Sequence, residues 1–243
     1  MRMPSHTRAI DAVLLDMDGT ILNSIKAAER VWRTWAERRG IDVDAFLPTI
    51  HGVQAVETIR RLGLAGIDPQ NEAAEITKAE IEDVDGIEPI AGAAAFLAML
   101  PHDKWGIVTS APRVLALRRI KAAGLPLPPL LISAEDVKRS KPAPDGFMHA
   151  AERLGTLAHR CLVIEDSPAG IAAAASSGAQ VLVVTATHHR PMEIRHPAIT
   201  DYRDLALERL PDGALSISHA GGPSELPDRL SCVLPPCAPH PAA

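Results

Sequence analysis

The chain has 243 residues, of which 47% are hydrophobic, and a formal net charge of −5; this composition excludes a chain too polar to fold. No cluster of Lys and Arg stands out, which argues against nucleic acid as the main partner. No window approaches the roughly 18 unbroken apolar residues of a membrane span. Residues 1–11 also lack the apolar segment of a secretory signal. We therefore expect a soluble cytoplasmic protein, acting as a monomer, whose partners include neither nucleic acid nor a membrane.

Short apolar runs alternate with helical patterns along the chain. The runs predict strands at residues 12–17, 104–110, 130–133, 161–166 and 181–185. They are almost continuously hydrophobic, which is typical of parallel strands covered on both faces. Helical patterns occupy residues 91–100, 112–124, 144–155 and 168–178. This alternation predicts an α/β fold, a doubly wound parallel sheet of the Rossmann-like kind.

One long segment interrupts the alternation. Helical patterns at residues 26–40, 53–63 and 69–84 follow the first strand with no strand between them. We interpret residues 23–85 as an inserted α-helical cap domain, and residues 1–22 and 86–210 as the core domain. Residues 211–243 are rich in Pro, Gly and Ser without a period, which predicts a disordered tail.

Cysteine and histidine give weaker signals. Cys161 stands at the head of an apolar run and is expected to be a buried free thiol. Cys232 and Cys237 lie in the proline-rich tail, where metal binding or a disulfide both remain open. Three histidines lack the i,i+4 spacing of helical metal ligands and are expected in solvent or at the rim of a site: His188, His189 and His196.

Polar side chains follow four of the predicted strands. Asp16 and Asp18 end the first, Thr109 and Ser110 the second, Lys141 follows the third, and Glu165 and Asp166 end the fourth. Ligands of an open parallel sheet bind beyond the carboxyl ends of its strands, so we expect these groups to meet.

The chemistry of this set is that of phosphoryl transfer. Carboxylates suit Mg²⁺, and we expect Asp16 and Asp166 to bind it with the main-chain carbonyl of Asp18 and with Glu165, directly or through a water. Gly19 eases the turn that would present this carbonyl. Asp16 is the expected nucleophile and Asp18 the general acid and base. The expected phosphate contacts are Gly19, Thr109, Ser110, Ala111 and Lys141, with the helix N-terminus that follows Ala111.

These motifs resemble those of the haloacid dehalogenase superfamily of phosphohydrolases. The residues that carry the resemblance are DMDGT, VTS, KPAPDGF and EDSPAGI, covering about residues 12–187. A cap after the first strand is similar to the subfamily that contains β-phosphoglucomutase and small sugar or polyol phosphatases. The stretches HGVQAVETIRRL, KWGIVTSAP and ISAEDVKRSKPAPDGF look most similar to glycerol-phosphate and 2-deoxyglucose-6-phosphate phosphatases. Two departures are Asn23, where relatives often carry aspartate, and Ala111, which replaces a common glycine or asparagine.

The resemblance implies a Mg²⁺-dependent phosphatase that hydrolyses small sugar or polyol phosphates through an aspartyl-phosphate. A sugar phosphomutase of the β-phosphoglucomutase type is the alternative, because it would use the same core residues. A receiver-like signalling module is a further alternative, although Asp18 and the cap argue against it. We expect substrate choice to lie in the cap, with His51, Gly52 and the helix through Glu57 and Arg60 facing the leaving group.

Overall fold

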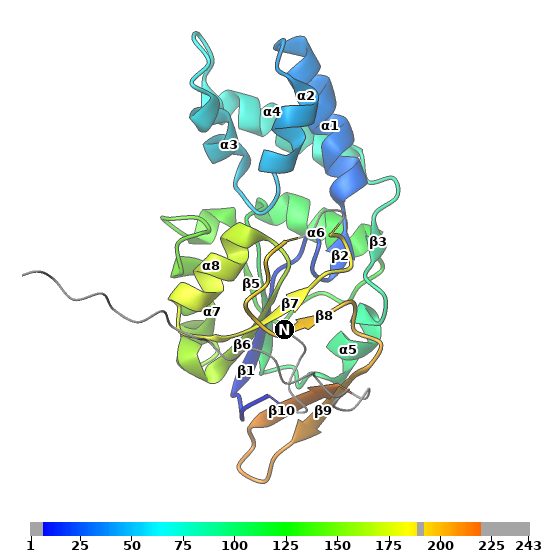
Figure 1. The fold of residues 1–243 in the computed structure, drawn as a ribbon, viewed down its shortest axis with the longest axis vertical. Helices are drawn as coiled ribbons and strands as arrows, with labels where there is room; N and C mark the ends of the chain where they lie inside the picture. Colours follow the sequence, from blue (N-terminus) through cyan, green and yellow to red (C-terminus); the bar gives the residue numbers. More distant parts are fainter. Residues whose placement is uncertain (1–6, 189–191, 220–243) are drawn as a thin grey trace, which may run out of the picture.

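The computed structural model describes residues 7–188 and 192–219. Its centre is a six-stranded parallel sheet in the order β5-β4-β1-β6-β7-β8 (Figure 1). The strands are β1 (Ala12–Leu15), β4 (Trp105–Val108), β5 (Leu131–Ile132), β6 (Cys161–Glu165), β7 (Gln180–Val184) and β8 (Ala198–Ile199). The predicted doubly wound parallel sheet is confirmed, and β8 is a strand that the sequence pattern did not indicate.

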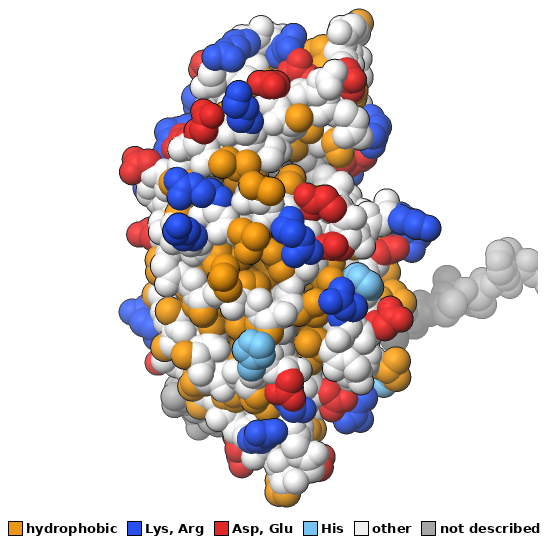
Figure 2. Space-filling view, turned by 180° about the vertical axis from the view of Figure 1, so that it is seen from behind, with side chains coloured by type: hydrophobic (Ala, Val, Ile, Leu, Met, Phe, Trp, Pro, Cys, Tyr) orange, Lys and Arg blue, Asp and Glu red, His pale blue; other side chains and the backbone are white. Residues whose placement is uncertain are grey.

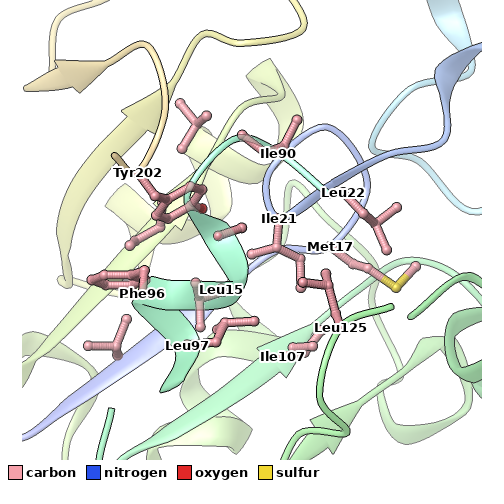
Figure 3. Close-up of a cluster of buried hydrophobic side chains, with 14 of the residues drawn as sticks. Leu15, Met17, Ile21, Leu22, Ile90, Phe96, Leu97, Ile107, Leu125 and Tyr202 are labelled. Atoms are coloured by element: carbon pink, nitrogen blue, oxygen red, sulfur yellow. The ribbon is translucent and has the colours of Figure 1, made fainter. Parts of the chain in front are cut away.

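Both faces of the sheet are buried. Successive residues of a strand point to opposite faces, and on β1 Val13 and Leu15 join one apolar cluster while Ala12 and Leu14 join another. The first cluster packs beneath α5 (Ala93–Met99) and α6 (Arg113–Ala122), and Figure 3 shows Phe96 and Leu97 of α5 beside Leu15. The second lies beneath α7 (Asp145–Arg153) and α8 (Pro168–Ser176). This double burial explains why β1 is hydrophobic at every position.

The order of the strands places a switch point at the carboxyl end of β1. From β1 the chain passes to β4 and β5 on one side, then returns to β6 and β7 on the other. Crossovers that leave in opposite directions open a crevice at the edge between them. The helical insertion lies at that end of the molecule (Figure 1).

The insertion buries a core of its own. It comprises α1 (Ile25–Arg38), α2 (Val43–Phe46), a 3₁₀ turn (Leu47–Thr49), α3 (Ala55–Leu62) and α4 (Pro69–Glu82). Trp32, Trp35 and Phe46 meet at its centre, with ring centroids 5.7–5.8 Å apart. Two short antiparallel strands, β2 (Leu22–Asn23) and β3 (Glu88–Pro89), pair where the chain enters and leaves it. The chain therefore crosses into and out of the insertion at one place.

The predicted tail is wrong for residues 211–219. β9 (Leu205–Arg209) and β10 (Leu215–His219) form an antiparallel hairpin in which Leu215 and Ile217 are fully buried. Leu215 also bridges to Ile10, just before β1. The Pro and Gly residues that suggested disorder make the hairpin turn instead, with Gly213 at φ +82°. Residues 220–243, with Cys232 and Cys237, lie outside the described residues.

Two further expectations concern burial and the surface. Cys161 is a fully buried free thiol, as predicted. Among the described helices, none has both the length and the apolar character needed to cross a bilayer. Figure 2 shows acidic and basic side chains interspersed over the rear face, without a field of one sign.

Candidate active site

Three buried carboxylates gather beyond β1 and β6. Asp16 follows β1, while Glu165 ends β6 and Asp166 follows it; one oxygen from each lies within 4.8 Å of the others. Each of these side chains is at least nine-tenths buried. Like charges at this spacing repel strongly in a medium of low dielectric constant, so the group needs nearby positive charge.

Lys141 supplies part of that charge. Its Nζ donates to Asp16 Oδ1, to Glu165 Oε1 at 2.8 Å and to the Val108 carbonyl at 3.0 Å. The ring of Phe147 lies 5.1 Å from the same nitrogen. Burial alone would lower the pKa of Lys141, but the charges of Asp16 and Glu165 outweigh it and raise this pKa. The lysine is therefore a permanent cation beneath Asp16.

One lysine does not neutralise three carboxylates. Burial raises the pKa of Asp16 to about 7, with Lys141 opposing the rise and Glu165 adding to it. Burial, then the charges of Glu165 and Asp16, also raise the pKa of Asp166 well above its ordinary value. A cluster of oxygen donors that is short of positive charge fits a hard divalent cation such as Mg²⁺.

The donors are not equivalent. Glu165 accepts from Lys141 through Oε1, and through Oε2 from the backbone N–H of Asp166 and Ser167 and from the Ser167 hydroxyl. It therefore orients its neighbours, whereas Asp16 and Asp166 have the freer oxygens. The Asp18 side chain lies outside this cluster.

The turn after β1 brings the backbone against Asp166. Gly19 has φ +86°, and a Cβ placed there would lie 2.1 Å from Asp166 Oδ2. Thr20 donates its hydroxyl to Asp166 Oδ1 at 2.8 Å. The Gly19 N–H donates to the Leu22 carbonyl at 2.7 Å, so this amide closes the turn. Only glycine fits this position without moving the carboxylate.

A hydroxyl faces the carboxylates from the end of β4. Ser110 lines the same cavity as Asp16, and its Oγ donates to the Gly52 carbonyl of the insertion at 3.0 Å. Thr109 and Ala111 also line it but are buried, and the Ala111 N–H donates to Thr109 Oγ1 at 3.1 Å. Ser110 thus offers the accessible hydroxyl of this loop.

Asp18 has a separate set of partners. Its Oδ1 accepts from Ser24 Oγ at 2.5 Å and from Arg119 Nη1 at 3.0 Å. Arg119 also reaches Glu80 Oε1 of α4 through Nη2 at 3.0 Å. Within the described residues, no hydrogen bond reaches Asp18 Oδ2, and 27% of this side chain is exposed. The carboxylate is held by one oxygen and presents the other to the cavity.

Sequence reasoning missed Arg119 and Glu80, although the sequence carries a signal for both. Each falls on the buried stripe of a helix: Arg119 lies four residues after Leu115, and Glu80 four after Ile76. Charged residues of opposite sign on two buried stripes indicate a buried pair.

The insertion contributes only some of the residues expected from it. His51 and Gly52 line the cavity, and His51 Nε2 lies 3.3 Å from Glu29 Oε1. Glu57 and Arg60 do not line it, because they pair with each other at 2.7 Å on the solvent side of α3. His188 contacts the Asp166 carbonyl oxygen through Nε2 at 2.8 Å and is not part of the lining.

Comparisons with known proteins show the family of this chain. A family model described as haloacid dehalogenase-like hydrolase matches residues 10–178. Hexitol phosphatase A of Escherichia coli is 40% identical over 183 residues, covering 73% of this chain and 84% of that protein. 2-Deoxyglucose-6-phosphate phosphatase 1 of Saccharomyces cerevisiae is 29% identical over 201 residues, covering 74% and 82%.

A solved structure supports the fold. The β-phosphoglucomutase of Clostridium difficile superimposes with a TM-score of 0.68 at 21% identity, covering 79% of this chain and 92% of that one. At this identity the likeness concerns the arrangement of the chain alone.

Proposed function

This chain belongs to the haloacid dehalogenase-like hydrolase family, and we propose that it is a Mg²⁺-dependent phosphatase of small sugar or polyol phosphates. One observation supports the proposal above all others. A buried carboxylate, Asp16, is bound by a buried lysine and shares one cavity with a hydroxyl, Ser110, and a second carboxylate, Asp18. Asp16 is the nucleophile, Ser110 a hydrogen-bond donor to the phosphate, and Asp18 the group that carries the proton, all in reach of one small ester.

The first half of the reaction is transfer to Asp16. Its carboxylate attacks phosphorus while Ser110 donates to a phosphoryl oxygen and the positive charge of Lys141, bound to Asp16, offsets the negative charge that gathers there. The bond from phosphorus to the ester oxygen breaks, and the leaving oxygen takes a proton from Asp18 Oδ2, the oxygen to which no described residue donates. Protonation contributes about 10²–10⁴-fold for a poor leaving group such as an alkoxide.

The second half is hydrolysis of the aspartyl-phosphate. Asp18, now a carboxylate, takes a proton from a water that attacks phosphorus. Inorganic phosphate leaves, Asp16 is restored, and Asp18 again carries its proton. Arg119 and Ser24 keep Asp18 in place through both steps by bonding to Oδ1 alone.

Mg²⁺ would be held by Asp16 and Asp166, with Asp18 contributing its main-chain carbonyl and Glu165 orienting the set. When bound, the cation balances the excess carboxylate charge and withdraws charge from the phosphoryl oxygens.

The substrate class rests on the relatives and on the cavity. The names of the two curated relatives specify phosphate esters of a hexitol and of a deoxy sugar. The cavity lies between the sheet and the insertion and measures about 100 Å³, which suits a small ester better than a polymer. The same names favour hydrolysis over the mutase alternative.

Release of inorganic phosphate from a panel of small esters tests the proposal. The panel includes glycerol phosphates, hexitol phosphates, 2-deoxyglucose 6-phosphate and β-glucose 1-phosphate, each with Mg²⁺ and each with EDTA. We expect release from one group of polyol or sugar phosphates, abolished by EDTA and restored by Mg²⁺. Conversion of glucose 1-phosphate to glucose 6-phosphate without release would show a mutase instead. Release that is indifferent to EDTA would contradict the metal requirement.

A further inference from the structure

The wall of the cavity is strongly acidic. Its lining carries four carboxylates, from Asp16, Asp18, Glu80 and Asp166, and in the described part of the chain its only Lys or Arg side chain is that of Arg119. Asp16 and Asp166 belong to the sheet side, where phosphate and metal would bind. Glu80 and Arg119 lie farther out, where α4 of the insertion meets α6 of the core.

Arg119 is paired with two of these acids. Its side chain is 7% exposed, with Nη1 bonded to Asp18 and Nη2 to Glu80, each at 3.0 Å. Its Nε is buried and has no partner among the described residues. Lys141 is likewise bound to Asp16 and Glu165, and His51 faces Glu29. Each basic side chain of this lining therefore already has a carboxylate partner, which lowers its attraction for an anion on the leaving group.

We propose that Glu80, by occupying Arg119, makes this phosphatase select substrates whose leaving group is uncharged and reject those with a second anionic group. This inference rests on the proposed function and narrows its substrate class. When Asp18 carries its proton, as the transfer step requires, Glu80 and Arg119 balance each other's charge. A carboxylate or second phosphate brought beside them loses water without gaining a cation, which costs several kcal/mol for a buried ion.

Hydroxyl groups meet the opposite situation. A hydroxyl donates to a carboxylate or accepts from a neighbouring hydroxyl, and the same wall offers Glu80 and, three residues earlier on α4, Thr77. Trp32, buried on α1, adds an apolar surface for the carbon chain. The wall is therefore suited to a neutral polyol or sugar.

Two substrates that differ at one end test the inference. Glucitol 6-phosphate ends in a CH₂OH group, and 6-phosphogluconate ends in a carboxylate on an otherwise similar chain. We expect wild-type kcat/KM, measured with Mg²⁺, to favour glucitol 6-phosphate by about 100-fold or more. In Glu80→Gln the preference should shrink by about 10-fold. The neutral amide no longer balances the charge of Arg119, which can then attract the carboxylate of 6-phosphogluconate.

Two further variants separate charge from shape. Glu80→Asp keeps the charge and should keep the preference, even if turnover falls. Glu75→Gln makes the same charge change on an exposed residue of the same helix and should leave the preference at the wild-type value. If Glu80→Gln does not fold, the wild-type preference decides whether a second anion is rejected, and loss of that preference in Glu80→Asp would overturn the role of Glu80.

The outcomes separate this inference from the proposed function. Equal hydrolysis of both esters by the wild-type enzyme would overturn the inference and leave the phosphatase intact. A Glu80→Gln change that lowers both values equally would show that Glu80 is structural, and would also overturn it. Release from neither ester nor any other small phosphate would overturn the proposed function and this inference with it.

Discussion

The two acids of the DMDGT turn, Asp16 and Asp18, are two positions apart but belong to different regions of the site. Asp16 is buried against Lys141, Glu165 and Asp166, all delivered by strand ends or the loops that follow them. Asp18 is partly exposed and is held by Arg119 and Ser24, which come from a helix and from the entrance to the insertion. The sheet side fixes a reacting group, whereas the insertion side leaves one oxygen free for a proton.

This difference has a physical cause. Neighbouring strands fix strand ends through a continuous ladder of hydrogen bonds, so a side chain one residue beyond β1 has little freedom. A helix face moves with its packing, and Glu80 and Arg119 stay together only while α4 rests against α6. We expect changes on the sheet side to abolish the reaction and changes on the insertion side to tune it.

The largest effect should follow Asp16→Asn. We expect phosphate release to fall on the order of 10⁵-fold or more, as when a covalent nucleophile is removed. The fold should survive, because burial raises the pKa of Asp16 to about 7 and ionisation of this group therefore opposes folding as the pH rises above 3.8. Thermal unfolding at pH 8 without metal should show the variant at least as stable as wild type.

The exposed Asp103→Asn serves as the matched control and should change neither property. Substantial residual turnover in Asp16→Asn would show that Asp16 is not the nucleophile. It would also contradict the view that the sheet side carries the reacting group.

Asp18→Asn should have the next largest effect, and one that depends on the substrate. Turnover of a hexitol phosphate should fall by about 10²–10⁴-fold, whereas that of 4-nitrophenyl phosphate, whose leaving group needs little protonation, should fall much less. Steady-state kinetics on both esters measure the difference. Equal losses would argue that Asp18 does not protonate the leaving oxygen.

Gly52→Ala examines contact between the insertion and the core. Gly52 has φ +75°, and a Cβ there would lie 2.5 Å from Ser167 Oγ. We expect kcat/KM to fall by about 10-fold, because the loop that meets Ser110 must withdraw. Gly66→Ala has a similar φ of +72° but open space around its Cβ, so it reproduces the backbone strain without the contact. Equal losses in both variants would assign the effect to strain.

Asp11 lies outside the site, and Asp11→Asn should have the smallest effect, a change in the free energy of unfolding. Asp11 accepts from Arg160 Nη2 at 2.7 Å and from Thr156 Oγ1 at 2.7 Å, and the Arg160 hydrogen bond is the main reason its pKa is lowered to about 2. Its contribution is therefore complete above pH 3.8 and is lost as the pH falls toward 2. Because Arg160 is half exposed, we expect the variant to lose about 1 kcal/mol or less at pH 7.

Chemical denaturation at pH 7 and at pH 3 measures this contribution. The gap between wild type and Asp11→Asn should narrow at the lower pH, and a gap that widens there would contradict the lowered pKa.

The difference between the sheet side and the insertion side also decides which site residues could be predicted from the sequence. Asp16, Lys141 and Asp166 could be found because parallel strands bring their carboxyl ends to one edge, whatever the details of packing. Arg119 and Glu80 could be recognised as a candidate buried pair but not placed beside Asp18, since their position depends on the angle between two helices of different regions. Glu57 and Arg60 were wrongly expected at the cavity for the same reason: a helical pattern does not say which face of α3 turns inward.

Amino-acid composition also gave a wrong prediction of disorder for residues 211–219. Pro211 and Gly213 read as the start of disorder, but two turn residues between alternating apolar positions also describe a hairpin. Leu215 and Ile217 carry that alternation, and both are fully buried beneath the sheet. A composition average over residues 211–243 concealed this short pattern.

The position of β1 at the centre of the sheet has a consequence for how the protein is made. Its neighbours are β4 and β6, and Thr20 finds its hydrogen-bond partner Asp166 only 146 positions later in the chain. At roughly 5–20 residues per second, a ribosome needs roughly 7–30 s to span that distance. The helical insertion carries its own apolar cluster and can collapse during this interval, before β4 and then β6 join the first strand. Catalytic competence therefore arrives late in synthesis, when the segment that bears Asp166 emerges and completes a site whose first residues were made long before.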